Sequence, residues 1–598
     1  MNPRWIAALP FVVLCMLAVI LRFWHLAEIP LALYHDEMDY VATGEAIARF
    51  DSDISGQWSP LQFVPLRTLN ITAELPAVFH AGVQTLFGLG PQTAHLPAAL
   101  FGLATVVLAG VLTYALSNNH RLAFLVALSL ASNPWHVYIS RLGYEAVISL
   151  FFQLVFISGL WLSVQTKRKD RQLLAVGIMV VGILSAFFSY HAAKFSMSVF
   201  VLAGGVWLWR EKTLQVWHRC TALTILVFTG ALLVFTQFSP GRTLLESRGS
   251  DLIFSNAYLA SQVDTERRVS LTYSPFSNSW LTNKLAVLIT STTDRYLSVF
   301  DVYRLFVSGY EGGFQFSLAV HGFFYLSSIP LVLLGIRWWA KAHRKAFTFI
   351  LTFLLLAPIA STITISYQSI FRSGITYLLM SFLIGAGAYA ALQAVSKLRQ
   401  PTIGIFLLGL LLCMEATWFG FRYFTRYPLV SAENHYFFEK LLAGYVRRVS
   451  DPIVVVVEGD PYSPARALVI YNHLLAQLTA AERQQFAEPK RDTYTFANMI
   501  VTNVCPEPSA SAAAVIVVDS AMLQTCQYDL SNSPEKSRKY GLGSPTDSRM
   551  YYYLLNDTIC VGVPLPAFIY NASLDDYQFD TLSNQDFCQR WVQEEKAR

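Results

Sequence analysis

The chain has 598 residues, of which 54% are hydrophobic and 14% are charged, and its mean hydropathy is +0.42. Soluble domains carry about 25% charged residues, so this composition excludes an ordinary soluble protein and indicates a polytopic membrane protein. The formal net charge of +5 is small and dispersed, which argues against a nucleic-acid partner.

Apolar runs of about 20 residues, the length that crosses a bilayer, recur along the first 421 residues. The first is interpreted as a retained span, because no small-residue cleavage site follows it and Arg22 and His25 close it. A shorter apolar piece near 75–89 carries His80 and is expected to be interfacial or re-entrant. The eleven predicted spans are 5–26, 93–116, 121–139, 145–165, 172–190, 194–209, 219–238, 316–336, 346–365, 373–395 and 401–421.

Alternate loops between these spans differ in charge, and by the positive-inside rule the basic loops are cytoplasmic. The opposite short loops each carry a single basic residue, Arg141, Lys194 or Arg372. An odd number of spans that starts inside places the C-terminal part outside. The basic loops contain Lys167, Arg168, Lys169, Arg171, Arg210, Lys212, Arg219, Arg337, Lys341, Arg344, Lys345, Lys397 and Arg399.

The seven cysteines support the same orientation. Three of them, Cys15, Cys220 and Cys413, fall in apolar runs and are interpreted as small core residues. The other four lie in the polar C-terminal part and allow one or two disulfides, which need an oxidising compartment. Those four are Cys505, Cys526, Cys560 and Cys588.

Composition changes near residue 425, so we predict a transmembrane domain over 1–424 and an extracytoplasmic α/β domain over 425–598. Buried strands are expected at Pro452–Val457 and Ala513–Asp519, a third at Met550–Leu555, and a helix at Ala465–Leu478. Strands that alternate with helices predict a partly parallel sheet. Two large external segments, about 27–92 and 239–315, interrupt the transmembrane domain; the second holds an amphipathic run at 294–300 that suits an interfacial helix.

An acidic cluster follows the first span directly: Tyr34-His35-Asp36-Glu37-Met38-Asp39-Tyr40. Ionisable groups at a membrane boundary are costly unless they have a function or partners. A carboxylate in such a place could act as a general base on a hydroxyl. The alternative is a solvated helix start, where the helix dipole favours carboxylates.

The chain around this cluster resembles the GT-C superfamily, and more narrowly its polyprenyl-phosphate-dependent enzymes, the protein O-mannosyltransferases and the lipid A aminoarabinose transferase. The resemblance covers roughly residues 1–425, and the acidic pair after span one is its most specific element. Three looser stretches also resemble that family: Leu86-Phe87-Gly88 to His95 through Gly102, Ser132 through Arg141, and Ser369-Ile370-Phe371-Arg372.

The resemblance implies that Asp36 is the general base, with Glu37 as its neighbour. It also implies that a second acid in the turn before span four, here Glu145, faces the same pocket; an i,i+4 ion pair with Arg141 is the alternative. The chain departs from the family at Ala73-Glu74-Leu75-Pro76, where a Lys-Pro-Pro motif is common, and at His95, where Arg is common. We assign substrate-binding roles to Glu145, His191, Tyr40, His35 and Glu74.

Lys194 and Arg372 are the sharper phosphate-binding candidates, with Arg141 beside them, because each is the lone cation of a short external loop. A polyprenyl-phosphate leaving group gains negative charge as the sugar departs, and a cation would stabilise it. Snorkelling toward lipid headgroups is the alternative.

We expect no obligatory cofactor. A divalent cation is the alternative, since His35, Asp36 and Glu37, with Glu74 or His80, have suitable ligand types.

The sequence therefore predicts an inverting glycosyltransferase in the plasma (inner) membrane with an extracytoplasmic active site. It would move a sugar, hexosyl or pentosyl, from a polyprenyl-phosphate donor to a hydroxyl of a glycolipid, an envelope glycan or a protein. The alternatives are a transporter or flippase of lipid-linked sugars and a non-catalytic glycan-binding membrane protein; the transporter is disfavoured because no repeated halves are found.

Overall fold

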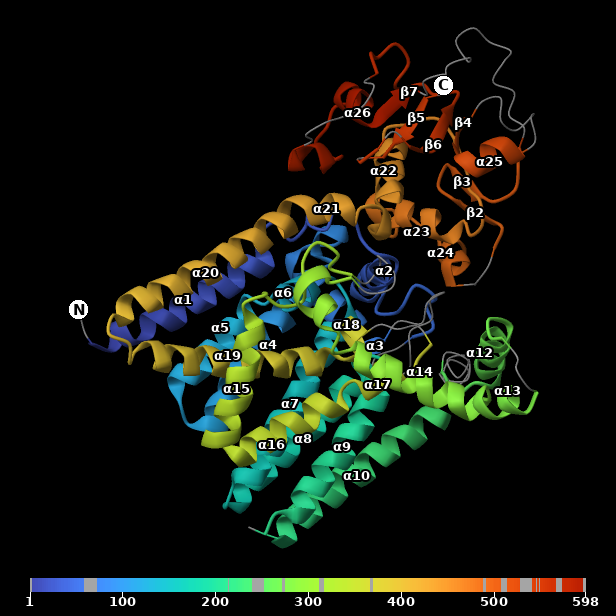
Figure 1. Ribbon diagram of the computed structural model, residues 1–598. Helices are drawn as coiled ribbons and strands as arrows, with labels where there is room; N and C mark the ends of the chain where they lie inside the picture. The colour runs from blue at the N-terminus through green and yellow to red at the C-terminus, as the bar shows by residue number, and fades with distance from the viewer. Residues whose placement is uncertain are drawn as a thin grey trace. The chain divides into compact units, whose positions relative to one another are not determined.

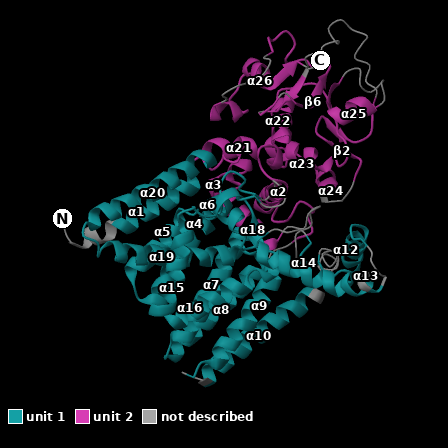
Figure 2. Ribbon diagram, viewed as in Figure 1, with its two compact units in different colours: residues 1–24, 98–423 teal, residues 25–97, 424–598 magenta. Residues whose placement is uncertain are grey.

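The computed structural model describes residues 3–58, 73–212, 215–238, 252–271, 275–310, 317–365, 369–487, 491–506, 514–526, 540–544, 546–547, 549–565 and 573–594. Parts of the predicted external segments, including residues 239–251, lie outside these ranges. The chain forms two compact units (Figures 1 and 2). Unit 1 comprises residues 1–24 and 98–423, and unit 2 comprises residues 25–97 and 424–598. The first external segment therefore belongs to the same unit as the C-terminal part.

Unit 1 is helical in the residues that the structure describes. Within the described ranges, seven stretches are long and apolar enough to cross a membrane: Pro91–Ser117, Glu145–Gln165, Lys169–Ser189, Val216–Thr236, Arg344–Thr362, Gly374–Val395 and Pro401–Val430. The α-helices are α1 (Pro3–Phe23), α4 (Leu96–Ser117), α5 (His120–Ala131), α6 (Pro134–Ile139), α7 (Glu145–Gln165), α8 (Lys169–Ser189), α9 (Ala193–Arg210), α10 (Gln215–Phe238), α12 (Asn256–Arg268), α13 (Pro275–Leu281), α14 (Lys284–Ser298), α15 (Ser328–Ala342), α16 (Arg344–Leu356), α17 (Ile359–Thr362), α18 (Ser369–Arg372), α19 (Gly374–Val395) and α20 (Pro401–Phe421). The π-helical turns η2 (Arg304–Ser308) and η4 (Arg422–Arg426) complete the set.

Three of the eleven predicted spans differ from the observed helices. The span expected at 346–365 is divided into α16 and α17 by a turn at Ala357 and Pro358. The span expected at 121–139 is two helices, because Asn133 caps a new helix whose first residue is Pro134. In the span expected at 316–336, the helix begins at Ser328. The preceding residues are apolar because they pack inside the protein: a Cβ on Gly322 would lie 2.4 Å from the backbone of Phe306.

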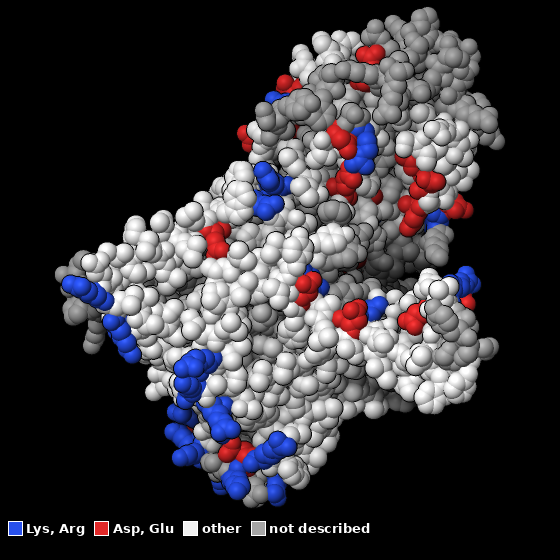
Figure 3. All heavy atoms as spheres, viewed as in Figure 1, with Lys and Arg blue, Asp and Glu red and all other residues white. Residues whose placement is uncertain are grey.

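The basic turns of unit 1 lie together at one end of its helices, as Figure 3 shows. Lys345, at the start of α16, forms an ion pair of 2.5 Å with Glu211 in the turn after α9. Lys169, at the start of α8, lies 5.6 Å from the ring of Trp217 on α10. These contacts place three of the predicted basic loops, those at 167–171, 210–219 and 337–345, on one side of the helical unit.

Unit 2 contains a mixed seven-stranded sheet with the order β2-β3-β1-β4-β6-β5-β7. Its centre is parallel: β1 pairs with β3 and with β4, and the outer strands join antiparallel. The partly parallel sheet is therefore confirmed. The strands are β1 (Ile453–Val456), β2 (Thr493–Phe496), β3 (Met499–Thr502), β4 (Val515–Asp519), β5 (Tyr540–Gly543), β6 (Met550–Leu555) and β7 (Val592–Glu594).

Alternate residues of the central strands feed two separate cores. Val454 and Val456 of β1 pack with Ile516 and Val518 of β4 in the smaller core, and Val455 and Val517 lie in the larger one. The larger core also receives residues from the helices α2, α22 and α23. The helices of unit 2 are α2 (His35–Phe50), α3 (Glu74–Phe87), η1 (Pro91–Thr93), α21 (Tyr427–Val430), η5 (Glu433–His435), α22 (Phe437–Val446), α23 (Tyr462–Tyr471), α24 (Ala480–Ala487), α25 (Ser520–Thr525), η6 (Leu574–Tyr577) and α26 (Asn584–Trp591).

Two disulfides join the four cysteines of the C-terminal part, Cys505 to Cys526 and Cys560 to Cys588. The remaining three cysteines, Cys15, Cys220 and Cys413, are exposed, so their assignment to the core was wrong. The reason is physical: a helix face that meets lipid is as apolar as one that meets protein, and sequence alone does not separate the two.

Candidate active site

The acidic cluster forms the first turns of α2. The Glu37 carboxylate accepts a hydrogen bond of 2.7 Å from the backbone N–H of Tyr34, which caps the helix start. At the other end, Asp51 adopts a left-handed conformation with φ of 52° and closes the helix. Gly44 lets α3 approach closely, since a Cβ there would lie 2.8 Å from the Cβ of His80. Local capping and this close packing together fix the direction in which α2 presents its acids.

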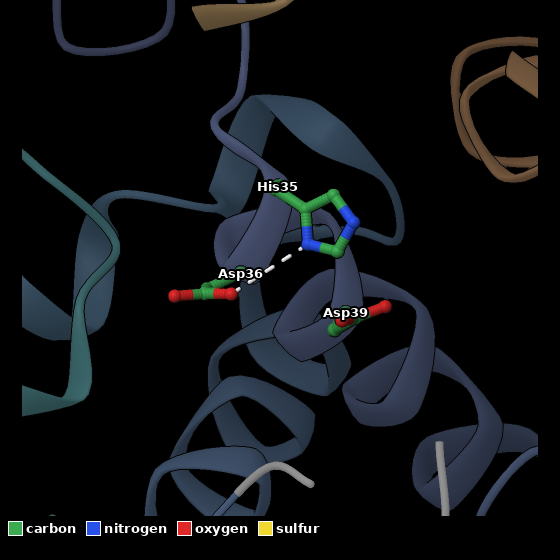
Figure 4. Close-up of side chains that lie close together, drawn as sticks. All are labelled: His35, Asp36 and Asp39. Atoms are coloured by element: carbon green, nitrogen blue, oxygen red, sulfur yellow. Dashed lines mark ion pairs between the residues drawn. The ribbon is translucent and has the colours of Figure 1, made fainter. Parts of the chain in front are cut away.

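The three carboxylates of the cluster have different surroundings. The Asp36 side chain is 42% exposed and lies 3.6 Å from the His35 ring, which is 23% exposed. Glu37 and Asp39 are completely buried. Figure 4 shows His35 paired with Asp36 at the start of the helix and Asp39 one turn further on. Of these three acids, Asp36 is therefore the one whose side chain reaches solvent.

Glu37 points into the protein, toward two histidines. Its carboxylate lies 3.6 Å from Nε2 of His95, whose Nδ1 lies 2.9 Å from the carbonyl oxygen of Leu26. Burial acts to raise the pKa of Glu37, but the charges of His95 and His435 and the Tyr34 N–H outweigh it, so the pKa lies below its ordinary value. Glu37 thus contributes a buried negative charge behind the surface that carries Asp36.

Asp39 is paired with a residue from the far end of the sequence. Arg466 on α23 donates a hydrogen bond of 2.6 Å to Oδ1 of Asp39, and the Tyr462 hydroxyl donates to the same oxygen at 3.3 Å. Glu439 on α22 is buried nearby, and burial raises its pKa to about 8 although the charge of Arg466 opposes the shift. This network joins α2 to two helices of the C-terminal part of unit 2.

One group in the described residues has ligand types and spacing suited to a metal ion: His35, Asp36 and Asp39, each of which offers an atom within 4.8 Å of the others. Glu37, which the sequence suggested as a ligand, faces His95 instead. Glu74 and His80 are not members of the group either. Arg466 already forms an ion pair with Oδ1 of Asp39, so a cation bound to this group would have to share the Asp39 carboxylate with a guanidinium of the same charge.

Tyr40 and Glu74 lie further along the same helix pair. The Tyr40 hydroxyl accepts a hydrogen bond of 3.1 Å from the N–H of Ala73, and its ring stacks on His80 at 5.6 Å. Glu74 accepts a hydrogen bond of 3.1 Å from the Trp58 indole. Burial raises the pKa of Glu74 to about 7, against the effect of that hydrogen bond. Glu74 therefore holds a carboxyl that is partly protonated near neutral pH.

The candidate cations belong to unit 1. Arg372 ends α18 and donates to the Thr364 hydroxyl. Lys194 lies in the first turn of α9, with its Nζ 5.7 Å from the Phe187 ring, and its backbone N–H donates to the carbonyl of His191. Both occupy helix ends opposite the basic turns. The structure thus places Lys194, His191 and Arg372 at one end of unit 1.

Arg141 and Glu145 also occupy this end. The Arg141 guanidinium is buried and donates to the carbonyl oxygens of Arg22 at 3.1 Å and Leu21 at 3.4 Å, where α1 ends. Glu145 is the first residue of α7. The preceding residue, Tyr144, packs its ring 4.9 Å from that of Phe371, the neighbour of Arg372. The turn before α7 and α18 are therefore adjacent.

Sequence reasoning missed several residues around the acidic cluster. Tyr436 lies 5.9 Å from the His35 ring and 5.9 Å from Tyr34, and it adopts a positive φ of 49°. His435 and Arg466 contribute to the buried network. The run Glu433 to Tyr436, four polar or aromatic residues where the composition changes, was the one signal available.

Comparison with known proteins gives a distant structural likeness. No protein-family model and no curated protein matches the sequence. Among solved structures, the chain is similar to the archaeal oligosaccharyltransferase AglB from Archaeoglobus fulgidus, in complex with an inhibitory peptide and a dolichol-phosphate, at 13% identity and a TM-score of 0.42, covering 94% of this chain and 75% of that one. It is also similar to ArnT from Cupriavidus metallidurans bound to undecaprenyl phosphate, at 13% identity and a TM-score of 0.47, covering 93% and 98%. The apo state of ArnT gives 14% identity, a TM-score of 0.44, and coverage of 92% and 98%. All three TM-scores lie below 0.5, so the likeness is distant and says nothing about the reaction or its substrates.

Proposed function

We propose that the protein is a membrane-embedded glycosyltransferase that moves one sugar from a polyprenyl-phosphate donor to an acceptor hydroxyl, with inversion at the anomeric carbon. The acceptor would be a glycolipid, an envelope glycan or a protein. The observation that carries the proposal is the separation of the three acids: Asp36 reaches solvent, and Glu37 and Asp39 are completely buried.

In the proposed reaction, Asp36 removes the proton of the acceptor hydroxyl, and the oxygen attacks the anomeric carbon of the donor. The bond from that carbon to the phosphate oxygen breaks, and its electron pair leaves with the polyprenyl phosphate. A positioned base contributes about 100- to 10,000-fold to such a rate. His35, 3.6 Å from Asp36, orients the carboxylate.

Arg372 and Lys194 would bind the phosphate, because a charge-assisted hydrogen bond strengthens as the leaving group gains charge. Arg141 is the weaker candidate of the three. Its guanidinium is anchored on carbonyl oxygens at the end of α1, which favours a structural role.

Asp36→Asn tests the base. Transfer by the purified full chain, measured with a panel of undecaprenyl-phosphate monosaccharides, is expected to fall at least 100-fold, with the melting temperature unchanged because Asp36 is half-exposed. The matched control is Asp51→Asn, an exposed acid at the other end of α2, where Asn tolerates the left-handed backbone. Near-normal transfer by Asp36→Asn would rule out this base.

Arg372→Met and Lys194→Met test the phosphate site. Each is expected to weaken binding of undecaprenyl phosphate by about 10- to 100-fold, since a hydrogen bond to a charged group contributes about 1.5–3 kcal/mol. Lys397→Met, in a turn between α19 and α20, is the control and should bind normally. Equal binding of undecaprenyl phosphate by all three variants would show that neither Arg372 nor Lys194 binds the phosphate.

The active site is proposed to face outward. Two disulfides in unit 2 support this side, because such bonds persist in oxidising compartments. The basic turns collected at one end of unit 1 support a cytoplasmic location for that end. Proteolysis of unit 2 in intact spheroplasts tests the orientation. Unit 2 is expected to be digested; full protection of unit 2 until the spheroplasts are lysed would show that it lies on the cytoplasmic side.

A further inference from the structure

Unit 2 contains a cavity of about 280 Å³ that the proposed reaction does not use. Neither His35 nor Asp36 is among the described residues that line it. Its walls come from the segment after α1, from the turn around η1, from α22, and from the chain around η6. The lining residues are Ala27, Glu28, Pro30, Leu31, Ala32, Leu33, Pro91, Gln92, His95, Lys440, Gly444, Arg447, Tyr471, His473, Leu574, Tyr577, Gln578, Phe579, Asp580 and Thr581.

Lys440 supplies a cation in the wall of this cavity. One ammonium N–H donates a hydrogen bond of 2.6 Å to the carbonyl oxygen of Leu31, and the nitrogen lies 5.6 Å from the Phe579 ring. In the described part of the chain, Lys440 has no carboxylate within ion-pair distance. Burial lowers the pKa of Lys440 to about 8, and the charges of Asp580 and Glu28 only partly oppose this shift. An anion bound directly beside the ammonium would therefore be stabilised.

The other charged groups of the cavity have closer partners than Lys440 or are partly exposed to solvent. Arg447 binds Asp580, and it also donates to the carbonyl of Tyr471 and the side chain of Asn472. Glu28 lies 3.5 Å from His25. Lys440 therefore sets the sign of the ligand that the cavity prefers.

The remaining lining suits a polyhydroxylated molecule. Tyr471, Tyr577 and Phe579 are buried aromatic side chains, against which the apolar face of a sugar ring can stack. Gln92 and Gln578 supply amides that donate to and accept from hydroxyls. Pockets for drug-sized ligands measure about 300–1,000 Å³, so this smaller volume suits one monosaccharide rather than a longer glycan.

We propose that this cavity binds a single sugar that carries a carboxylate or phosphate group, with Lys440 as its anion contact. The binding itself is independent of the proposed function. Its use, as the place where an acidic sugar of the acceptor is recognised away from Asp36, rests on the proposed function.

Calorimetric titration of the purified full chain tests the site with four probes: glucuronate, glucose 6-phosphate, glucose and inorganic phosphate. At least one of the two anionic sugars is expected to bind, and glucose and inorganic phosphate are expected to bind at least tenfold more weakly. If glucose bound as tightly as that sugar, the anion contact would be wrong. If inorganic phosphate bound as tightly as that sugar, the sugar assignment would be wrong. If neither anionic sugar bound, the proposed site would be wrong.

Two variants test the location. Lys440→Met keeps the length of the side chain and removes a buried charge, and it should lose about 10- to 100-fold in affinity for the anionic sugar. Gln578→Trp fills the cavity from a different wall and should abolish binding. Lys397→Met is the matched control. Unchanged affinity in both cavity variants would overturn the proposal.

Asp36→Asn separates this proposal from the proposed function. The variant is expected to bind the anionic sugar normally, because Asp36 does not line the cavity. Loss of binding in Asp36→Asn would show that the two sites are one, which overturns the proposal of a separate site. Failure of glycosyl transfer in the unmodified protein would leave the binding result standing.

Discussion

Arg466 and Asp39 lie 427 positions apart in the sequence, and their side chains form a buried ion pair of 2.6 Å. Asp39 is completely buried and the Arg466 side chain is 3% exposed. Because Asp39 lies one turn after Asp36 on α2, this pair fixes the helix that presents the candidate base. Asp39 is thereby a positioning residue: it holds α2 in place through Arg466 and is not assigned a part in the reaction.

We predict that Arg466→Met lowers the stability of the protein by about 3–5 kcal/mol, since removing one partner leaves a buried charge without compensation. Thermal unfolding of the full chain measures the loss. Arg268→Met is the control, because its ion pair with Asp264 is exposed at 77% and 59% and should contribute less than about 1 kcal/mol. Equal shifts for both variants would contradict a structural role for the buried pair.

Glu439 gives the folded protein a pH dependence of opposite sign to that of most acids. Burial raises its pKa from 4.5 to about 8, so the folded state holds a proton that the unfolded state has lost across this interval. The stability that Glu439 contributes to the folded state is fully present below pH 4.5 and is lost as the pH rises through 8. Each pH unit within the interval changes stability by about 1.4 kcal/mol at most.

Glu439→Gln should therefore flatten the stability profile between pH 5 and pH 8, because an amide keeps the neutral form throughout. Melting temperatures of the two proteins at several pH values provide the measurement. The variant should gain most over the wild type at the alkaline end. A profile with the same slope in both proteins would assign the dependence to another group.

Glu37 should behave in the ordinary direction. Burial acts to raise the pKa of Glu37, but the charge of His95 and the Tyr34 N–H lower it below 4.5. Its contribution to the stability of the fold is therefore present above pH 4.5 and is lost as the pH falls through the pKa of the folded state. We predict that Glu37→Gln costs about 1–3 kcal/mol at pH 7 and that the difference from wild type narrows toward pH 3. Urea unfolding at both pH values measures it, with Asp36→Asn as the half-exposed control that changes little.

The sequence predicted what physics imposes locally. The length of an apolar run is set by the bilayer, so seven of the predicted spans have long apolar helices in the structure. The acidic turn could be found because its three carboxylates are neighbours in the chain. The disulfide-bearing sheet domain was foreseen from its apolar strands and its four cysteines.

The partners of these residues could not be predicted, because they come from remote parts of the chain. Nothing near Asp39 in the sequence points to Arg466, and nothing near Leu31 points to Lys440. The apolar segment before Ser328 looked like half of a span because a residue buried by protein and one facing lipid have the same composition. The wrong assignments of the cysteines and of the segment before Ser328 concern the surrounding medium, whereas the span at 121–139 was wrong because the local cap at Asn133 was not recognised.

Metal removal provides the last test of the acidic cluster. The candidate group of His35, Asp36 and Asp39 would need Asp39 as a ligand, and Oδ1 of its carboxylate forms an ion pair with Arg466. The positive charge of Arg466 repels a divalent cation at this carboxylate, so we predict that glycosyl transfer survives dialysis against EDTA with less than a twofold loss. Mn²⁺ or Zn²⁺ is then added back to the dialysed protein, and neither ion should stimulate transfer. Transfer that disappears with EDTA and returns with one of these ions would contradict the prediction and show that the reaction needs a metal ion.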